Sequence, residues 1–171
     1  MSADTASGKT RADAVAKIAE LVKDARIGML TTMTSDGAHV SRPMGLQQVE
    51  FDGDLWFFAY DDSAKVAQIT AEPSVNVAFS DTKASSWTSV SGTAEVVHDR
   101  GKAEELWNPM LHAWFADGLE THGLTLIKVH ADTAEYWDSP SSKVVRLIGM
   151  ARAAITHDPD SFPGENATVT L

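Results

Sequence analysis

Residues 55–66 read LWFFAYDDSAKV and carry the clearest structural signal in the chain. Leu55 to Tyr60 is almost wholly apolar and aromatic, a composition typical of a strand that is buried on both faces. We therefore expect this strand to be central in a sheet. Asp61-Asp62-Ser63 favours a helix N-terminus, and predicts a short helix from about Ala64 to Ala71 that stops before Pro73.

The residues before this stretch predict a helix followed by a hairpin. Residues 10–26 place apolar side chains at helical spacing on one face and charges on the other. Residues 27–34 then read as a strand, and Ser35-Asp36-Gly37 is a turn signal that leads into a second strand over residues 39–51. Asp52-Gly53-Asp54 forms the next turn and returns the chain to the buried strand.

The residues after it predict further strands with short helical insertions. We expect strands over 75–80, 87–98, 124–130 and 133–137, with a bend at Gly92. A helical segment is expected over 100–107, and a short helix or loop over 109–118. Residues 143–156 fit either a strand or a helix, and we predict a helix. Residues 1–9 are expected to be extended or mobile. The tail from about residue 157 to 171 is expected either to extend over a neighbour or to be mobile.

This order of elements predicts the fold class. One helix followed by mostly antiparallel strands indicates a mainly β (α+β) barrel rather than a doubly wound sheet. We expect about six to seven antiparallel strands with short flanking helices. At 171 residues the chain is expected to form a single domain, residues 1–171.

Composition and charge exclude several function classes. The formal net charge of −10 opposes binding to nucleic acid and to anionic membranes. No apolar run approaches a membrane span and no signal core opens the chain, so we expect a cytoplasmic protein without membrane contact. With no cysteine and six scattered histidines, no metal site is predicted. Neither a Gly-x-Gly-x-x-Gly fingerprint nor a Walker loop is present.

The start of the helix after Tyr60 could bind a phosphate. A helix N-terminus exposes unpaired N–H groups and partial positive charge, and Ser63 and Lys65 would add a hydroxyl and an ammonium. An ordinary capped helix with a solvated lysine explains the same residues equally well. Both interpretations remain open on local grounds.

A second cation lies on the preceding strand, in Ser41-Arg42-Pro43-Met44. An arginine flanked by apolar residues on a barrel strand favours a fixed anion, and a guanidinium suits phosphate in bidentate geometry. An exposed arginine on an edge strand is the alternative.

Taken in order, Arg42, Phe57-Phe58-Ala59 and Ser63-Ala64-Lys65 resemble the FMN-binding split β-barrels related to pyridoxamine 5′-phosphate oxidase, and most closely their bacterial general stress protein branch. The resemblance covers about residues 12–148. It implies that Arg42, Ser63 and Lys65 bind the FMN phosphate, and that the backbone of Phe58 and Ala59 borders the flavin.

The resemblance continues through the second half of the chain. The segment from Trp87 to Gly92 resembles the strand that faces the flavin ring, and Trp137 with Lys143 resembles a C-terminal pair that reaches the partner subunit's cofactor. Trp107 and Trp114 belong to an aromatic insertion that the resemblance places near the partner's flavin; without the resemblance, these two and Trp56 would be assigned to the core. The cofactor-binding residues expected in total are Arg42, Pro43, Met44, Phe57, Phe58, Ala59, Tyr60, Ser63, Lys65, Val66, Trp87, Ser89, Trp107, Trp137 and Lys143.

Three departures from the oxidase pattern limit what is implied. Ala64 replaces an arginine and Gln47 replaces a lysine, so a weaker or differently arranged phosphate site is expected. Leu147 occupies the position of a substrate-binding arginine, so pyridoxamine phosphate oxidase activity is not expected. The resemblance implies a homodimer with FMN at the subunit interface and a flavin-dependent oxidoreductase acting on a small molecule. The alternatives are a non-catalytic flavin carrier or sensor, and a relative that binds a deazaflavin or haem. No catalytic residue is predicted.

Overall fold

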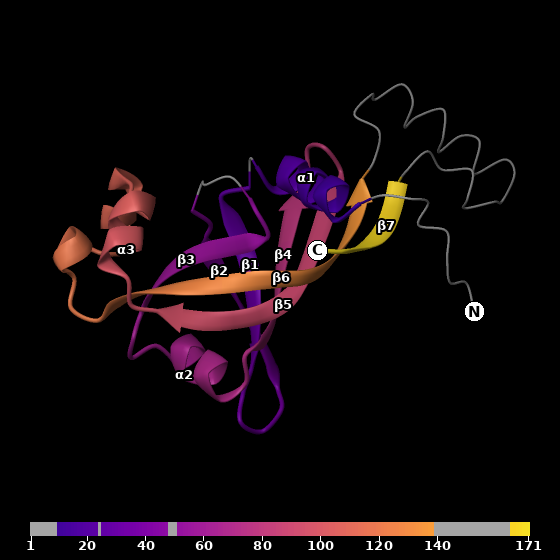
Figure 1. The fold of residues 1–171 in the computed structure, drawn as a ribbon. Helices are drawn as coiled ribbons and strands as arrows, with labels where there is room; N and C mark the ends of the chain where they lie inside the picture. Colours follow the sequence, from indigo (N-terminus) through magenta and orange to yellow (C-terminus); the bar gives the residue numbers. More distant parts are fainter. Residues whose placement is uncertain (1–9, 24, 48–50, 139–164) are drawn as a thin grey trace, which may run out of the picture.

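The computed structural model describes residues 10–23, 25–47, 51–138 and 165–171. Within these ranges an antiparallel sheet of seven strands is accompanied by three α-helices and two short 3-10 helices (Figure 1). The elements in chain order are α1 (Arg11–Val22), β1 (Ile27–Met33), β2 (His39–Gly45), β3 (Asp54–Tyr60), α2 (Ala64–Ala71), β4 (Ser74–Asp81), β5 (Ser86–Val97), α3 (Arg100–Leu106), η1 (Pro109–Ala113), η2 (Gly118–Glu120), β6 (Leu124–Asp138) and β7 (Glu165–Thr170).

The strand order confirms the expected α+β split barrel. Neighbouring strands follow the path β2-β1-β4-β5-β6-β3, and β7 pairs with β6 off this path. An isolated antiparallel bridge between Leu46, just after β2, and Phe57 of β3 brings the two ends of the path together. The sheet therefore curves back on itself and encloses one core.

The central position predicted for β3 is wrong. β3 is the last strand of the path and pairs along its length only with β6. Its burial on both faces is nevertheless correct, because Phe57 packs in the main core and Phe58 packs in a second cluster outside the barrel. Apolar composition reports that both faces of a strand are covered, whether by another sheet layer or by helices, and does not report its place in the sheet.

Two helices lie at opposite ends of the barrel (Figure 1). α1 begins with a capping box in which Thr10 and Asp13 satisfy each other's backbone N–H groups, and it buries Ala14, Ile18 and Val22. It ends four residues earlier than the predicted helix over 10–26. α2 has the predicted bounds, buries Val66 and Ile69, and packs against β1 and β5.

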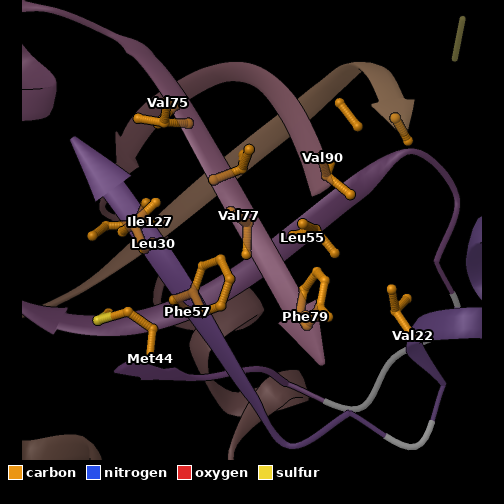
Figure 2. Packing of buried hydrophobic residues seen from close by; sticks show 14 of the residues in the cluster. Val22, Leu30, Met44, Leu55, Phe57, Val75, Val77, Phe79, Val90 and Ile127 are labelled. Carbon is orange, nitrogen blue, oxygen red and sulfur yellow. The ribbon is translucent and has the colours of Figure 1, made fainter. Parts of the chain in front are cut away.

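The main core fills the barrel with side chains from alternate positions of the strands (Figure 2). Leu30, Phe57, Val77, Val90 and Ile127 are fully buried there. Leu30 lies opposite Val77 on β4, and Val77 lies opposite Val90 on β5, so one row of buried residues crosses three strands. Arg42 of β2 is paired with Leu30, so its side chain projects to the same inner side of the sheet as this row.

The bounds of two predicted stretches of strand differ in the structure. The strands predicted over 124–130 and 133–137 form one continuous strand, β6, and its pairing with β5 shifts register between Ser91 and Gly92, where Asp132 of β6 is the extra residue. A Cβ at Gly92 would come within 1.9 Å of the His130 carbonyl oxygen, so the close approach of β5 and β6 requires glycine there. The second strand of the hairpin, predicted over 39–51, ends at Gly45.

The described part of the C-terminal tail is an extended strand of the same sheet. Residues 165–170 form β7, which pairs with β6 of the same chain from Thr133 to Asp138, and Leu171 is buried in the main core. The predicted helix over 143–156, Lys143, Leu147 and residues 1–9 lie outside the described residues. No helix in the described part of the chain is long and apolar enough to cross a membrane.

Candidate functional site

Arg42 lies on the inward face of β2, next to the first strand of the barrel. It is paired with the buried Leu30 of β1, and strand pairs that face each other directly project their side chains to the same side. Its Nη1 donates to Thr32 Oγ1 at 2.6 Å and its Nη2 donates to Gln68 Oε1 at 3.0 Å. Arg42 is thus fixed between β1 and α2 rather than free in solvent.

The first turn of α2 lies near Arg42. Ser63 is the N-cap residue, but its side chain accepts no capping hydrogen bond, and its hydroxyl donates to the Tyr60 carbonyl oxygen at 2.6 Å. Ser63 therefore occupies the predicted N-cap position without a capping hydrogen bond. The backbone N–H groups of Ser63 and Val66 donate to the carbonyl oxygens of Tyr60 and Ser63, whereas those of Ala64 and Lys65 have no acceptor among the described residues, which suits an anion.

Lys65, in this first turn, is electrostatically coupled to Arg42. Partial burial lowers the pKa of the Lys65 ammonium, and the nearby positive charge of Arg42 lowers it further. Burial also lowers the pKa of Arg42. No Asp or Glu of the described residues forms an ion pair with either side chain. Two like charges without a counter-ion favour an external anion.

The acids beside this turn are engaged elsewhere or exposed. Asp61 Oδ1 lies 2.9 Å from Nε2 of His98, and the Asp61 backbone N–H donates to the Gly123 carbonyl oxygen. Asp62 is exposed. The positive charge of Arg42 and Lys65 is therefore not neutralised by these two carboxylates through direct pairing.

Several residues expected at the site have buried side chains. They are packed in the main core or the second cluster, so they could meet a ligand only through their backbone: Met44, Phe57, Phe58, Ala59 and Val66. For Phe58 and Ala59 this agrees with the expected backbone role.

The expected ring neighbours lie on the other face of the sheet. Trp87 of β5 and Trp137 of β6 are directly opposite each other and point away from the buried Thr88 and Tyr136. Trp87 is 45% exposed and Trp137 is 41% exposed. Ser89 shares this outer face and accepts a hydrogen bond from Asn76 Nδ2 at 2.8 Å. One chain therefore does not bring these residues together with Arg42 and Lys65.

Pro43 also faces outward, since it is paired with Met29 of β1, which is 41% exposed. Met29 lies opposite Ala78, and Ala78 lies opposite Ser89, so the row from Pro43 reaches β5 across the outer face. The predicted site residues are thus divided between an inner group around Arg42 and an outer group around Trp87.

The aromatic insertion packs on β3 and forms the second cluster. Trp107 contacts the ring of Phe58 edge-on with a centroid distance of 5.5 Å, and the Tyr60 hydroxyl donates to the Trp114 carbonyl oxygen at 2.7 Å. Trp107 is half-buried, whereas Trp114 is 60% exposed. Trp107 and Trp56 therefore take part in packing within this chain, whereas Trp114 lies at its surface.

A cavity of about 480 Å³ lies between α1 and the segment that enters β3. Ala16, Ala19, Gln47, Leu55 and Trp56 are among its lining residues. No residue predicted to bind the cofactor lines it, so this hollow is separate from the Arg42 and Lys65 pair.

Two residues at the site were missed by the sequence analysis. Thr32 is 1% exposed and Gln68 lies one helical turn after Lys65, and both contact Arg42. Strand alternation from Leu30 would have placed Thr32 inward, and helical spacing from Lys65 would have placed Gln68 on the same face. Neither pattern shows that β1 and α2 meet at Arg42.

Comparison with known proteins agrees with this fold. The chain is 33% identical over 144 residues to the protein bli-3 of Neurospora crassa, an alignment that covers 78% of this chain and 69% of bli-3. A protein from Jannaschia sp. CCS1 assigned to general stress protein 26 superposes with a TM-score of 0.75 at 27% identity, covering 94% of this chain and 99% of that chain.

The general stress FMN/FAD binding protein of Xanthomonas citri superposes with a TM-score of 0.65 at 32% identity, covering 75% of this chain and 90% of that chain. The family described as pyridoxamine 5′-phosphate oxidase like matches residues 13–160. Since this match includes every strand from β1 to β6 and both cations of the site, the chain belongs to the pyridoxamine 5′-phosphate oxidase-like family.

Proposed function

We propose that this chain is a stress-related flavoprotein that binds FMN and holds the FMN phosphate between Arg42, Ser63 and Lys65. The observation that carries the proposal is the meeting of two cations, without a carboxylate partner among the described residues, at the first turn of α2. A phosphate accepts from a guanidinium, an ammonium and helical N–H groups together. The FMN/FAD binding relative from Xanthomonas citri supports a flavin as the ligand.

We also propose a homodimer in which each flavin lies between the two subunits. Arg42 is on the inner face of the sheet and Lys65 is in α2, whereas Trp87 and Trp137 are on the outer face. A flavin that contacts both groups therefore needs the outer face of a second copy. The exposed apolar side chains of Ile27, Met29, Trp87 and Trp137 on that face are consistent with an interface.

As the specific activity we propose an FMN-dependent oxidoreductase that acts on a small molecule. When bound, FMN supplies electron and hydride transfer. The chain anchors the phosphate through Arg42 and Lys65, and the backbone of Phe58 and Ala59 limits how far the flavin can move. Trp87 and Trp137 from the partner are proposed to orient the ring.

A non-catalytic flavin carrier or sensor is the second candidate. It is favoured by the chemistry of the described site: Arg42, Thr32, Ser63, Lys65 and Gln68 bind and orient an anion, and none of them is a carboxylate or imidazole suited to general acid or base catalysis. Turnover separates the two candidates. Steady-state oxidation of NADH or NADPH by the FMN-loaded protein should exceed the rate with free FMN for an enzyme, and equal it for a carrier.

The test of flavin binding is an absorption spectrum of the purified protein, followed by titration with FMN, FAD and riboflavin. We expect a flavin band and the highest affinity for FMN. Absence of flavin binding after incubation with all three would overturn the proposal. Binding of a deazaflavin or haem in place of flavin would assign the chain to another branch of the family.

A further inference from the structure

Arg42, Thr32 and Gln68 form a closed ring of hydrogen bonds. Arg42 donates to both Thr32 Oγ1 and Gln68 Oε1, at 2.6 and 3.0 Å, and Thr32 Oγ1 donates to Gln68 Oε1 at 2.6 Å. Because a guanidinium can only donate, the side-chain oxygen of Gln68 must face Arg42. The three side chains come from β2, β1 and α2, so the ring ties the arginine to both neighbouring elements.

The ring leaves most of the guanidinium available. Of its five N–H donors, two are used by Thr32 and Gln68. The other N–H groups have no protein acceptor in the described parts of the chain. An arginine held by one edge, with the rest of its donors free, is oriented for an external acceptor before the acceptor arrives.

Both partners of Arg42 are neutral. A partly buried arginine is most often paired with a carboxylate, which would cancel its charge toward a ligand. Gln68 and Thr32 satisfy donors of Arg42 without supplying a negative charge. The full positive charge of Arg42 then acts on Lys65, and the same charge is available to an anion at the first turn of α2.

We propose that Gln68 and Thr32 are positioning residues that hold Arg42 for the phosphate of the flavin, and that the neutrality of Gln68 makes the site selective for a phosphorylated ligand. This inference rests on the proposed function, since it names the residues that tune the same site. It predicts that a carboxylate at position 68, with nearly the same shape, would take the place of the ligand phosphate.

The experiment compares FMN with riboflavin, which lacks the phosphate, by fluorescence titration of Gln68→Glu. We expect the FMN affinity of this variant to fall at least tenfold and the riboflavin affinity to change less than twofold. A merely structural role of Gln68 would weaken both ligands together. Ala67→Glu is the matched control, because it adds the same charge to an exposed position of the same helix; we expect it to change the FMN affinity less than threefold.

Thr32→Val provides a second variant of nearly unchanged shape should Gln68→Glu fail to fold. We expect it to lower the FMN affinity severalfold and leave riboflavin unchanged. If the wild-type protein prefers FMN to riboflavin and both variants keep this preference, the inference is overturned while the phosphate site stands.

If the wild-type protein binds FMN no more tightly than riboflavin, the proposed anchorage of the flavin phosphate fails. The role of Gln68 is then tested by thermal denaturation with inorganic phosphate alone. Phosphate should raise the melting temperature of the wild-type protein and of Ala67→Glu, and raise that of Gln68→Glu much less. An equal rise in all three proteins would overturn the role of Gln68.

Discussion

Arg42 and Lys65 lie on different elements, β2 and α2, and the charge of Arg42 lowers the pKa of Lys65. Burial of Lys65 is the larger cause of this shift, and no carboxylate of the described residues pairs with either cation. Binding of a phosphate would relieve both the repulsion and the unfavourable burial of charge. This relationship predicts the response of the protein to substitution and to pH.

Replacing Lys65 by alanine should weaken FMN binding. Loss of a charge-assisted contact costs about 1–3 kcal/mol, so the dissociation constant should rise roughly 5- to 150-fold. Riboflavin affinity should change little, because it has no phosphate. Titration by flavin fluorescence measures both, and Lys23→Ala, an exposed lysine at the end of α1, is the control. Unchanged FMN affinity in Lys65→Ala would place the phosphate elsewhere.

The affinity for FMN should decrease as the pH rises in the alkaline range. The pKa of Lys65 in the ligand-free folded protein is below its ordinary value of 10.5, so the folded chain releases this proton at a lower pH than the unfolded chain does. Between the folded and unfolded pKa values, the free energy of unfolding of the ligand-free protein therefore rises with pH. A bound phosphate is stabilised by the charged ammonium of Lys65, so FMN loses this contact as Lys65 loses its proton.

Titrations of the wild-type protein and of Lys65→Arg across this pH range test the prediction. The arginine keeps its charge, so the FMN affinity of this variant should fall less. Riboflavin measured in parallel corrects for ionisation of the flavin ring. Parallel FMN profiles for the two proteins, after this correction, would show that Lys65 is not the group that titrates.

Replacing Trp137 by glutamate should dissociate the proposed dimer. Trp137 and Trp87 face each other across β6 and β5 on the exposed side of the sheet, and a charge buried there would oppose association. Analytical ultracentrifugation should show a dimer for the wild-type protein and a monomer for Trp137→Glu, with loss of FMN binding in the monomer. Ala12→Glu, on the exposed side of α1, should remain dimeric. A wild-type monomer that binds FMN would contradict the shared site.

Replacing Gly92 by alanine should destabilise the fold. Its Cβ would lie 1.9 Å from the His130 carbonyl oxygen, and backbone on two paired strands would have to move. Overpacking of this kind costs about 1–3 kcal/mol, measured by urea denaturation. Gly45→Ala is the control, since a Cβ there meets nothing within 4 Å. Equal stability of the two variants would show that β5 and β6 can separate at this point without cost.

The hairpin from residue 27, the buried strand, α2 and the long strand from 86 could all be predicted from the sequence. Each depends on residues a few positions apart: the turn at Gly37, the apolar run to Tyr60 and the stop at Pro73. The position of β3 in the sheet could not be predicted, because Phe58 is covered by α3 and η1, which follow β5, rather than by another strand. β7 was missed for a similar reason, since its partner lies in β6 and its own sequence is short and polar.

The candidate site was predicted in part. Arg42 and Lys65 were identified because their order along the chain resembles that of the family, and the structure brings them together. Trp87 and Trp137, which were predicted to contact the same cofactor, lie on the other face of the sheet. Gln68 and Thr32 were not identified, because a glutamine on a helix and a threonine on a strand have no signal of their own.

The sequence by itself determined the helix and strand periods, the turns and the presence of a cation in the first turn of α2, because these follow from neighbouring residues. Only the tertiary structure decided that α2 packs on β1 and β5, so that Arg42 is held by two neutral side chains beside Lys65. The physical reason is that partial burial, and the lack of a counter-ion among the described residues, depend on which side chains neighbouring elements bring together. They arise when strands distant in the chain pair and bring their side chains together.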